Sequence, residues 1–139
     1  MSKLIQIVED NPKNMKLFRV ILQANGHSTI EAVNGKQGIE LAIAHKPDLI
    51  LMDIMLPILN GFEAVRLLNL DPKTKAIPVI ALTSHAMTGD KEKAFKAGFN
   101  GYITKPIHMR DFLKEISEII QRPLNPPIEG GLEEKGMKK

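Results

Sequence analysis

The sequence predicts an α/β domain in which helices cover both faces of an open parallel sheet. Short, almost continuous apolar runs recur along the 139-residue chain, as in strands that are buried on both faces. Segments with helical periodicity or helix-capping residues separate these runs. Strand and helix alternate five times, and a closed barrel of eight such units would need ~200 residues or more. An open sheet with right-handed crossovers is therefore expected.

The apolar runs are expected as strands because they lack the alternation of a half-exposed strand. The second and the last of them are weaker than the other three. In chain order the runs are LIQIV (4–8), HSTIEA (27–32), DLILM (48–52), PVIALT (78–83) and GYITK (101–105).

The intervening segments are expected as helices, at 11–26, 35–46, 61–70, 88–98 and 108–122. In the first, Asn11 is placed as the N-cap, Pro12 at the first helical position and Gly26 past the end. The second stops before Pro47, the third ends ahead of an Asp-Pro pair, and the fourth has Thr88 as its N-cap. The last carries a helix-spaced apolar stripe, made by Phe112, Leu113, Ile116, Ile119 and Ile120.

Composition excludes several classes of function. The chain has no cysteine, which rules out disulfides and thiolate chemistry. Its net charge is only +3 and it has no basic stripe, so no nucleic acid partner is expected. No apolar run approaches the ~20 residues of a membrane span, and the first ten residues do not have the pattern of a signal peptide. We expect a cytoplasmic protein without a membrane partner.

The character of the chain changes after Arg122. The segment PLNPPIEGGLEEKGMKK (123–139) contains three prolines and three glycines and little apolar surface to bury. Such composition is typical of a flexible tail. The predicted organisation is one domain over 1–122 followed by this tail.

Polar side chains follow four of the five strands. Glu9 and Asp10 follow the first, Asp53 the third, Thr83 ends the fourth and Lys105 ends the fifth. Open α/β sheets bind ligands at the carboxyl ends of their strands, where the strand order reverses. In a flavodoxin-like order of 2-1-3-4-5 the first and third strands are neighbours. The three acids are therefore expected to converge, with Thr83 and Lys105 beside them.

Three converging carboxylates indicate a cation, because they repel one another and raise each other's pKa. Oxygen ligands with room for water suit Mg²⁺ better than Ca²⁺. The four histidines show no metal-ligand spacing, so zinc is not expected. Such a site suits phosphoryl transfer to a carboxylate. We expect Asp53 as the nucleophile, Glu9 and Asp10 as metal ligands, and Lys105 and Thr83 as partners of the phosphoryl oxygens.

Each of these residues also has an ordinary structural explanation. Acids at strand ends often cap the next helix, a threonine favours strands, and a single lysine is usually solvated. Chance is nevertheless a poor explanation for five such residues at the correct ends of four strands.

With these residues in place, the sequence resembles a response-regulator receiver domain over about residues 3–122. The family has an acidic pair after the first strand, an acceptor segment D-x-x-x-P-x-x-[DN]-G, a Ser or Thr after the fourth strand and Lys-Pro after the fifth. Matching residues occur in order: Glu9, Asp10, Asp53, Pro57, Asn60, Gly61, Thr83, Lys105 and Pro106. One departure is that Ile58 and Leu59 make the loop after the acceptor more apolar than exposure to water would suggest.

The resemblance implies a detailed site. Asp53 would accept the phosphoryl group. Asp10 and Asp53 would bind Mg²⁺ directly, Glu9 would bind it through water, and the Met55 backbone carbonyl would be a further ligand. Met55 and His85 stand at positions where the family tunes the lifetime of the phosphoryl group.

The resemblance also implies a switch. The Lys105–Pro106 bond would be cis, which X-Pro bonds adopt at modest cost. On phosphorylation Thr83 would move toward the phosphoryl group and Tyr102 would turn inward behind it. Without the family, Tyr102 is interpreted as a half-buried aromatic residue of the last strand.

The expected partners are proteins. The family implies a histidine kinase or histidine phosphotransfer protein as donor and a downstream protein target that binds the phosphorylated surface. The tail is too short for an output domain. Met15 and Leu22 lie beside the core stripe expected for the first helix (Leu17, Phe18, Ile21 and Ala24). We interpret these two residues as a docking flank, with partial burial against a neighbouring loop as the alternative.

Other classes fit less well. Haloacid-dehalogenase-like phosphatases and Toprim-type nucleases need a second aspartate two residues after the first, where this chain has Met55. A flavodoxin would need a phosphate loop in place of the acidic EDNPKN, and a DNA-binding regulator would need a helix-turn-helix beyond residue 122. We expect a phosphoacceptor signalling protein, not an enzyme acting on other substrates. The alternative is a receiver fold that acts as a phosphorylation-independent interaction module.

Overall fold

The five predicted strands form one parallel sheet in the computed structural model, which describes residues 2–83 and 90–121. The spatial order is β2-β1-β3-β4-β5, and every neighbouring pair is parallel. This confirms the predicted flavodoxin-like fold. The strands are β1 (Leu4–Val8), β2 (Ser28–Ala32), β3 (Leu49–Asp53), β4 (Val79–Thr83) and β5 (Gly101–Thr104).

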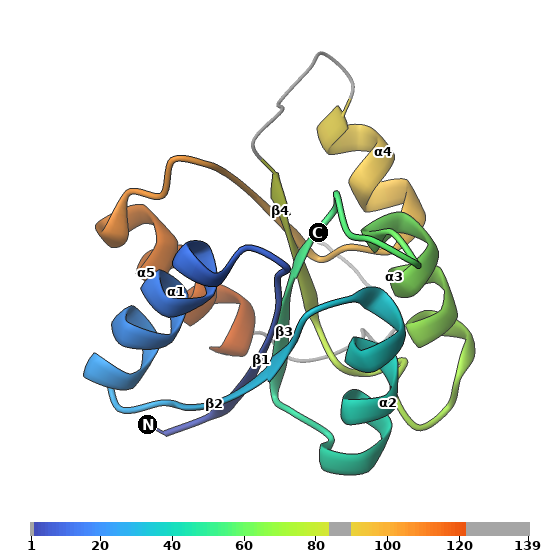
Figure 1. Cartoon of the computed structure of the whole chain (residues 1–139), viewed down its shortest axis with the longest axis horizontal. Coiled ribbons are helices and arrows are strands. Elements are labelled where there is room, and N and C mark those ends of the chain that lie inside the picture. Colours follow the sequence, from blue (N-terminus) through green and yellow to red (C-terminus); the bar gives the residue numbers. More distant parts are fainter. Residues whose placement is uncertain (1, 84–89, 122–139) are drawn as a thin grey trace, which may run out of the picture.

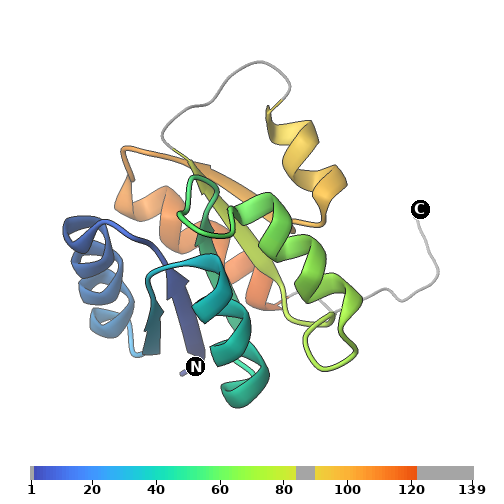
Figure 2. The same ribbon diagram turned by 45° about the vertical axis from the view of Figure 1, so that its right-hand side comes forward.

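Helices lie on both faces of this sheet, with α1 and α5 on one side and α2, α3 and α4 on the other (Figure 1). Figure 2 shows α2 and α3 side by side in the turned view. The Asn11 side chain caps α1 by accepting the Lys13 and Asn14 N–H groups. The helices are α1 (Pro12–Ala24), α2 (Gly35–His45), α3 (Gly61–Leu70), α4 (Asp90–Ala97) and α5 (Met109–Gln121).

Two apolar cores sandwich the sheet, one on each face. The first joins the sheet to α2, α3 and α4 through residues such as Ile50, Met52 and Val65. The second joins it to α1 and α5, where the Phe18 and Phe112 rings stack with centroids 5.6 Å apart. The central strands β3 and β4 are buried along their whole length. This double burial explains their continuous apolar sequence.

The interpretation of Met15 and Leu22 as a docking flank is wrong. The two residues are only 6% and 0% exposed and pack in the core with Phe18. Leu17, which was assigned to the core stripe, is 44% exposed, and Ala24 is exposed as well. The apolar residues of α1 allow two overlapping stripes at helical spacing, and packing against the sheet and α5 selects one of them.

Three expectations fall on residues outside the described ranges: Thr88 as an N-cap, His85 as a lifetime-tuning residue, and the tail 123–139. The boundary at residue 122 therefore remains a prediction. Of the helices in the described part of the chain, none combines the length and apolar character needed to cross a membrane.

Candidate functional site

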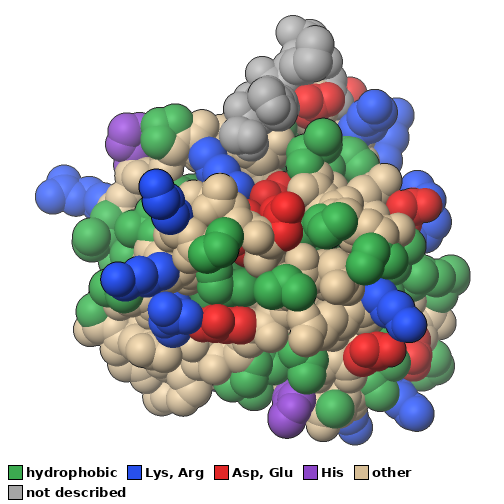
Figure 3. Space-filling view, in the orientation of Figure 1, with side chains coloured by type: hydrophobic (Ala, Val, Ile, Leu, Met, Phe, Trp, Pro, Cys, Tyr) green, Lys and Arg blue, Asp and Glu red, His purple; other side chains and the backbone are tan. Residues whose placement is uncertain are grey.

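Three carboxylates meet at the carboxyl ends of β1 and β3. Glu9, Asp10 and Asp53 each offer an oxygen atom, and these atoms lie within 4.8 Å of one another. Glu9 and Asp53 are 1% and 6% exposed, whereas Asp10 is exposed. The acids meet here because β1 and β3 are neighbouring parallel strands, as the order 2-1-3-4-5 requires. The space-filling view shows acidic side chains near the centre of this face with hydrophobic side chains beside them (Figure 3).

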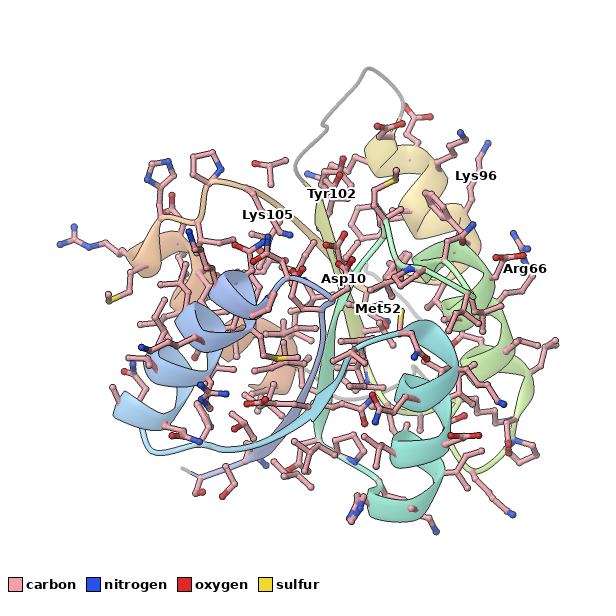
Figure 4. The ribbon with its side chains drawn as sticks, in the orientation of Figure 1. Asp10, Met52, Arg66, Lys96, Tyr102 and Lys105 are labelled. Carbon is pink, nitrogen blue, oxygen red and sulfur yellow. The ribbon has the colours of Figure 1, made fainter. Side chains whose placement is uncertain are left out.

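Lys105 brings a positive charge to the acids. Its Nζ donates to Glu9 Oε1 at 2.9 Å and to Asp53 Oδ2 at 3.0 Å. The lysine backbone is fixed by its N–H, which donates to the Thr83 carbonyl at 2.7 Å. The following Lys105–Pro106 peptide bond is cis. Figure 4 shows Lys105 and Asp10 at the same end of the sheet.

The burial of these charges shifts their pKa values. Burial raises the pKa of the Glu9 carboxyl above its usual value, and the nearby Asp53 charge adds to this increase. Hydrogen bonds from the Lys105 ammonium and the Asn11 N–H oppose the increase in part. Burial would lower the pKa of Lys105, but its hydrogen bonds to Glu9 and Asp53 outweigh this effect and raise it. One lysine therefore offsets two carboxylates only in part, and the site favours a further cation.

Replacing Glu9 with glutamine should change how the stability of the metal-free protein depends on pH. Because the pKa of Glu9 is raised on folding, the folded state keeps a proton that the unfolded state releases, so wild-type stability falls as pH rises above the usual glutamate value near 4.5. Glu9→Gln lacks this loss, so its stability relative to wild type should improve from pH 5 to pH 7. Urea unfolding with a chelator measures both proteins, and an identical pH dependence would contradict the assignment.

The loop between β3 and α3 holds the Asp53 carboxylate. The Met55 N–H donates to Asp53 Oδ1 at 2.9 Å, and the Gly61 N–H closes the loop on the Ile54 carbonyl at 2.9 Å. A Cβ on Gly61 would lie 2.7 Å from Ile54 Cα and 2.8 Å from the Asp53 carbonyl oxygen. A side chain at this position of the acceptor segment would therefore clash, because α3 begins against the backbone at the end of β3. Met55 is 65% exposed.

Thr83 and Tyr102 lie at the other predicted positions. Thr83 ends β4 and is 3% exposed. Tyr102 lies on β5, and its hydroxyl is buried without a hydrogen-bond partner in the described part of the chain. Burial raises the pKa of this phenol, and the Asp90 charge adds to the effect. Figure 4 shows Tyr102 on the side of the site toward α4.

Sequence reasoning missed the surroundings of the acids on the side of α1 and β2. Arg19 and Glu31 form an ion pair there, with an N–O distance of 2.6 Å. A cavity of about 260 Å³ is lined by both residues together with Glu9, Asp10, Pro12, Met15 and Val33. No spacing along the chain indicates this proximity, because it depends on how α1 packs over β2.

The fold and site together define a class of protein: a doubly wound receiver-type domain with an acidic cluster and a lysine at the carboxyl ends of its strands. Residues 5–117 match the family described as the response regulator receiver domain, and the chain belongs to this family. It is therefore a phosphoacceptor signalling protein of two-component systems, whose class of partner is a histidine kinase, and not a true enzyme.

Similar proteins include single regulators and receiver domains. The chain is 46% identical over 120 residues to the polar-differentiation response regulator DivK of Brucella anthropi, covering 86% of this chain and 98% of that protein. The DivK of Brucella ovis is 45% identical with the same coverage.

Solved structures show the same fold. The receiver domain of the sensor histidine kinase PA1611 from Pseudomonas aeruginosa PAO1 is similar with a TM-score of 0.81 and 32% identity, over 88% of this chain and all of that one. That structure has a magnesium ion coordinated in its active site cleft. The chemotaxis protein CheY4 of Vibrio cholerae has a TM-score of 0.80 at 23% identity, over 86% of this chain and 99% of that one, and shows the fold alone.

Proposed function

We propose that Asp53 accepts a phosphoryl group from a histidine kinase or histidine phosphotransfer protein. The observation that carries this assignment is the position of its carboxylate, which accepts from the Lys105 ammonium at 3.0 Å and has an oxygen within 4.8 Å of carboxylate oxygens of Glu9 and Asp10. Asp53 is therefore paired with the lysine and is also one of the three acids that could hold a cation. It is also held by a backbone N–H, so its orientation is set before a donor arrives.

The transfer itself needs little covalent chemistry from the protein. An Asp53 oxygen forms a bond to phosphorus while the bond from phosphorus to the donor's imidazole nitrogen breaks, and the imidazole leaves. Lys105 then pairs with a phosphoryl oxygen, and the Thr83 hydroxyl donates to another. Water attacking phosphorus later releases phosphate and restores the carboxylate. Met55 is exposed and stands two residues after the acceptor, and it is proposed to tune the lifetime of the phosphoryl group.

The donor set fits Mg²⁺. Every candidate ligand atom is a carboxylate or carbonyl oxygen, and the exposure of Asp10 leaves room for water. Asp10 and Asp53 would hold the ion directly, Glu9 would hold it through water, and the Met55 carbonyl would complete the protein's contribution. The bound ion would supply positive charge that neutralises the oxygens of the transferred group.

The output is proposed to be a phosphorylation-dependent protein-binding surface that a downstream protein recognises. Tyr102 is proposed to report the state of the site. Its buried hydroxyl has no hydrogen-bond partner within the described residues, and β5 places it three residues before Lys105. A change at the phosphoryl group would thereby be passed toward α4.

Intact mass spectrometry tests the proposal directly. Wild-type protein incubated with acetyl phosphate and Mg²⁺ should gain the mass of one phosphoryl group, and a chelator should prevent the gain. Far-UV circular dichroism of the same samples controls for folding. A folded protein that gains no mass with Mg²⁺ present would instead support a phosphorylation-independent interaction module.

A further inference from the structure

Gly35 brings the first turn of α2 unusually close to the loop between β3 and α3. It is buried, and a Cβ built on it would lie 2.2 Å from the Leu59 carbonyl oxygen and 3.1 Å from the Leu59 carbonyl carbon. Both are backbone atoms, so a flexible side chain cannot move aside to relieve the clash. Asn34 anchors this turn, since its side chain accepts the Gln37 N–H at 2.8 Å. The helix start and the loop therefore touch backbone to backbone.

The loop itself is held in a strained conformation. Ile58 has a φ of 70°, a conformation that is unfavourable for a β-branched residue. A tight turn encloses it, because the Leu59 N–H donates to the Pro57 carbonyl at 2.7 Å. Ile58 is 79% exposed, so burial of its side chain does not explain the conformation. Such strain persists where surrounding contacts hold the backbone, and Gly35 supplies one of these contacts.

The loop also carries the groups that set the geometry of the acidic site. At its start, the Met55 N–H holds Asp53 Oδ1, and the carbonyl of the same residue is a proposed metal ligand. At its end, Gly61 packs against the Asp53 carbonyl oxygen. A shift of Leu59 is passed along these few residues to Met55, because the loop is short and closed by the Gly61–Ile54 hydrogen bond.

We infer that Gly35 is a positioning residue for the metal and phosphoacceptor site, acting through Leu59 and the loop that holds Met55. The inference rests on the proposed function, since it concerns how the same site is kept in shape. Helix α2 provides none of the three acidic residues of the site, but through Gly35 it contributes to the affinity of the site for metal. The physical basis is close backbone approach, which only glycine permits.

The test compares two alanine substitutions in the same helix. In Gly35→Ala the new Cβ meets backbone, whereas in Gly38→Ala it meets the Val8 side chain at 3.0 Å. Both substitutions crowd the structure, but only the first should move the loop. Isothermal titration calorimetry with Mg²⁺ should show binding weakened by about tenfold in Gly35→Ala, as for a group that supports metal ligands. Gly38→Ala should bind within about twofold of wild type while losing stability to urea.

Two further measurements keep the outcome clear. The Met55 amide signal in ¹H–¹⁵N NMR spectra should shift in metal-free Gly35→Ala and stay in place in Gly38→Ala. If Gly35→Ala does not fold, Leu59→Gly removes the Leu59 Cβ and gives the loop backbone more freedom at the same contact, so it should weaken Mg²⁺ binding. Wild-type affinity in folded Gly35→Ala, or in Leu59→Gly where Gly35→Ala does not fold, would overturn the inference. Absence of Mg²⁺ binding in wild type would instead overturn the proposed function.

Discussion

Asp53→Asn is expected to gain no phosphate from acetyl phosphate in the presence of Mg²⁺, while wild type gains one. An amide oxygen is a poor nucleophile, and the substitution also removes one of the negative charges proposed to bind the ion. Asparagine retains an oxygen that can accept the Met55 N–H, so the loop should keep its place. Intact mass measured over time gives the result, and rates should fall to the background of the assay.

The matched control is Asp48→Asn, directly before the opposite end of β3. Asp48 Oδ2 accepts the Leu4 N–H at 2.8 Å, and asparagine can accept this bond as well. This variant should be phosphorylated like wild type. If Asp53→Asn were still phosphorylated, the acceptor would be another residue, and peptide mapping would find it.

Lys105→Met is expected to destabilise the metal-free protein by about 3 kcal/mol at pH 7, because it leaves two largely buried carboxylates without their cation. The lysine side chain is 13% exposed, and those of Glu9 and Asp53 are 1% and 9% exposed. Water therefore screens these charges little. Urea unfolding with a chelator measures the loss, and phosphorylation by acetyl phosphate should be slowed in the same variant.

The dependence on pH identifies the cause of this loss. Because the pKa of Glu9 is already raised, lowering the pH toward 5 protonates this group first and should reduce the deficit of Lys105→Met. The wild-type contribution of Lys105 should itself disappear only above the usual lysine value near 10.5, since the pKa of the ammonium is raised. Lys114→Met, on the exposed face of α5, is the control and should change stability little. If Lys105→Met lost the same stability relative to wild type at pH 5 and at pH 7, the cause would be lost packing instead of unpaired charge.

Local sequence signals determined most of the strands and helices. Asn11 and Pro12 mark the start of α1 through capping, and the apolar runs of β3 and β4 reflect burial on both faces. The acids could be assigned to one site for the same reason. Once strands are known to be parallel and ordered 2-1-3-4-5, residues that follow β1 and β3 must share one edge of the sheet.

The buried face of α1 could not be predicted in the same way. The buried stripe at helical spacing contains Met15, Phe18 and Leu22. A second stripe extends to Leu17 and Ala24, which are exposed. The periodicity of the helix permits both, since the sequence contains apolar residues over more than half of its circumference. The choice depends on how the helix is rotated against β1, β2 and α5, which is a property of packing.

The sequence by itself determined the order of the elements, the chemistry of the acceptor site and the family, because strand ends, helix caps and motif spacing are local properties of the chain. Only the tertiary structure decided that Lys105 reaches both Glu9 and Asp53, and that Gly35 closes on Leu59. Gly35 and Leu59 are far apart in the chain, and their contact requires α2 to be docked on the sheet beside α3. Such contacts arise from the packing of whole elements, for which no short segment carries a signal.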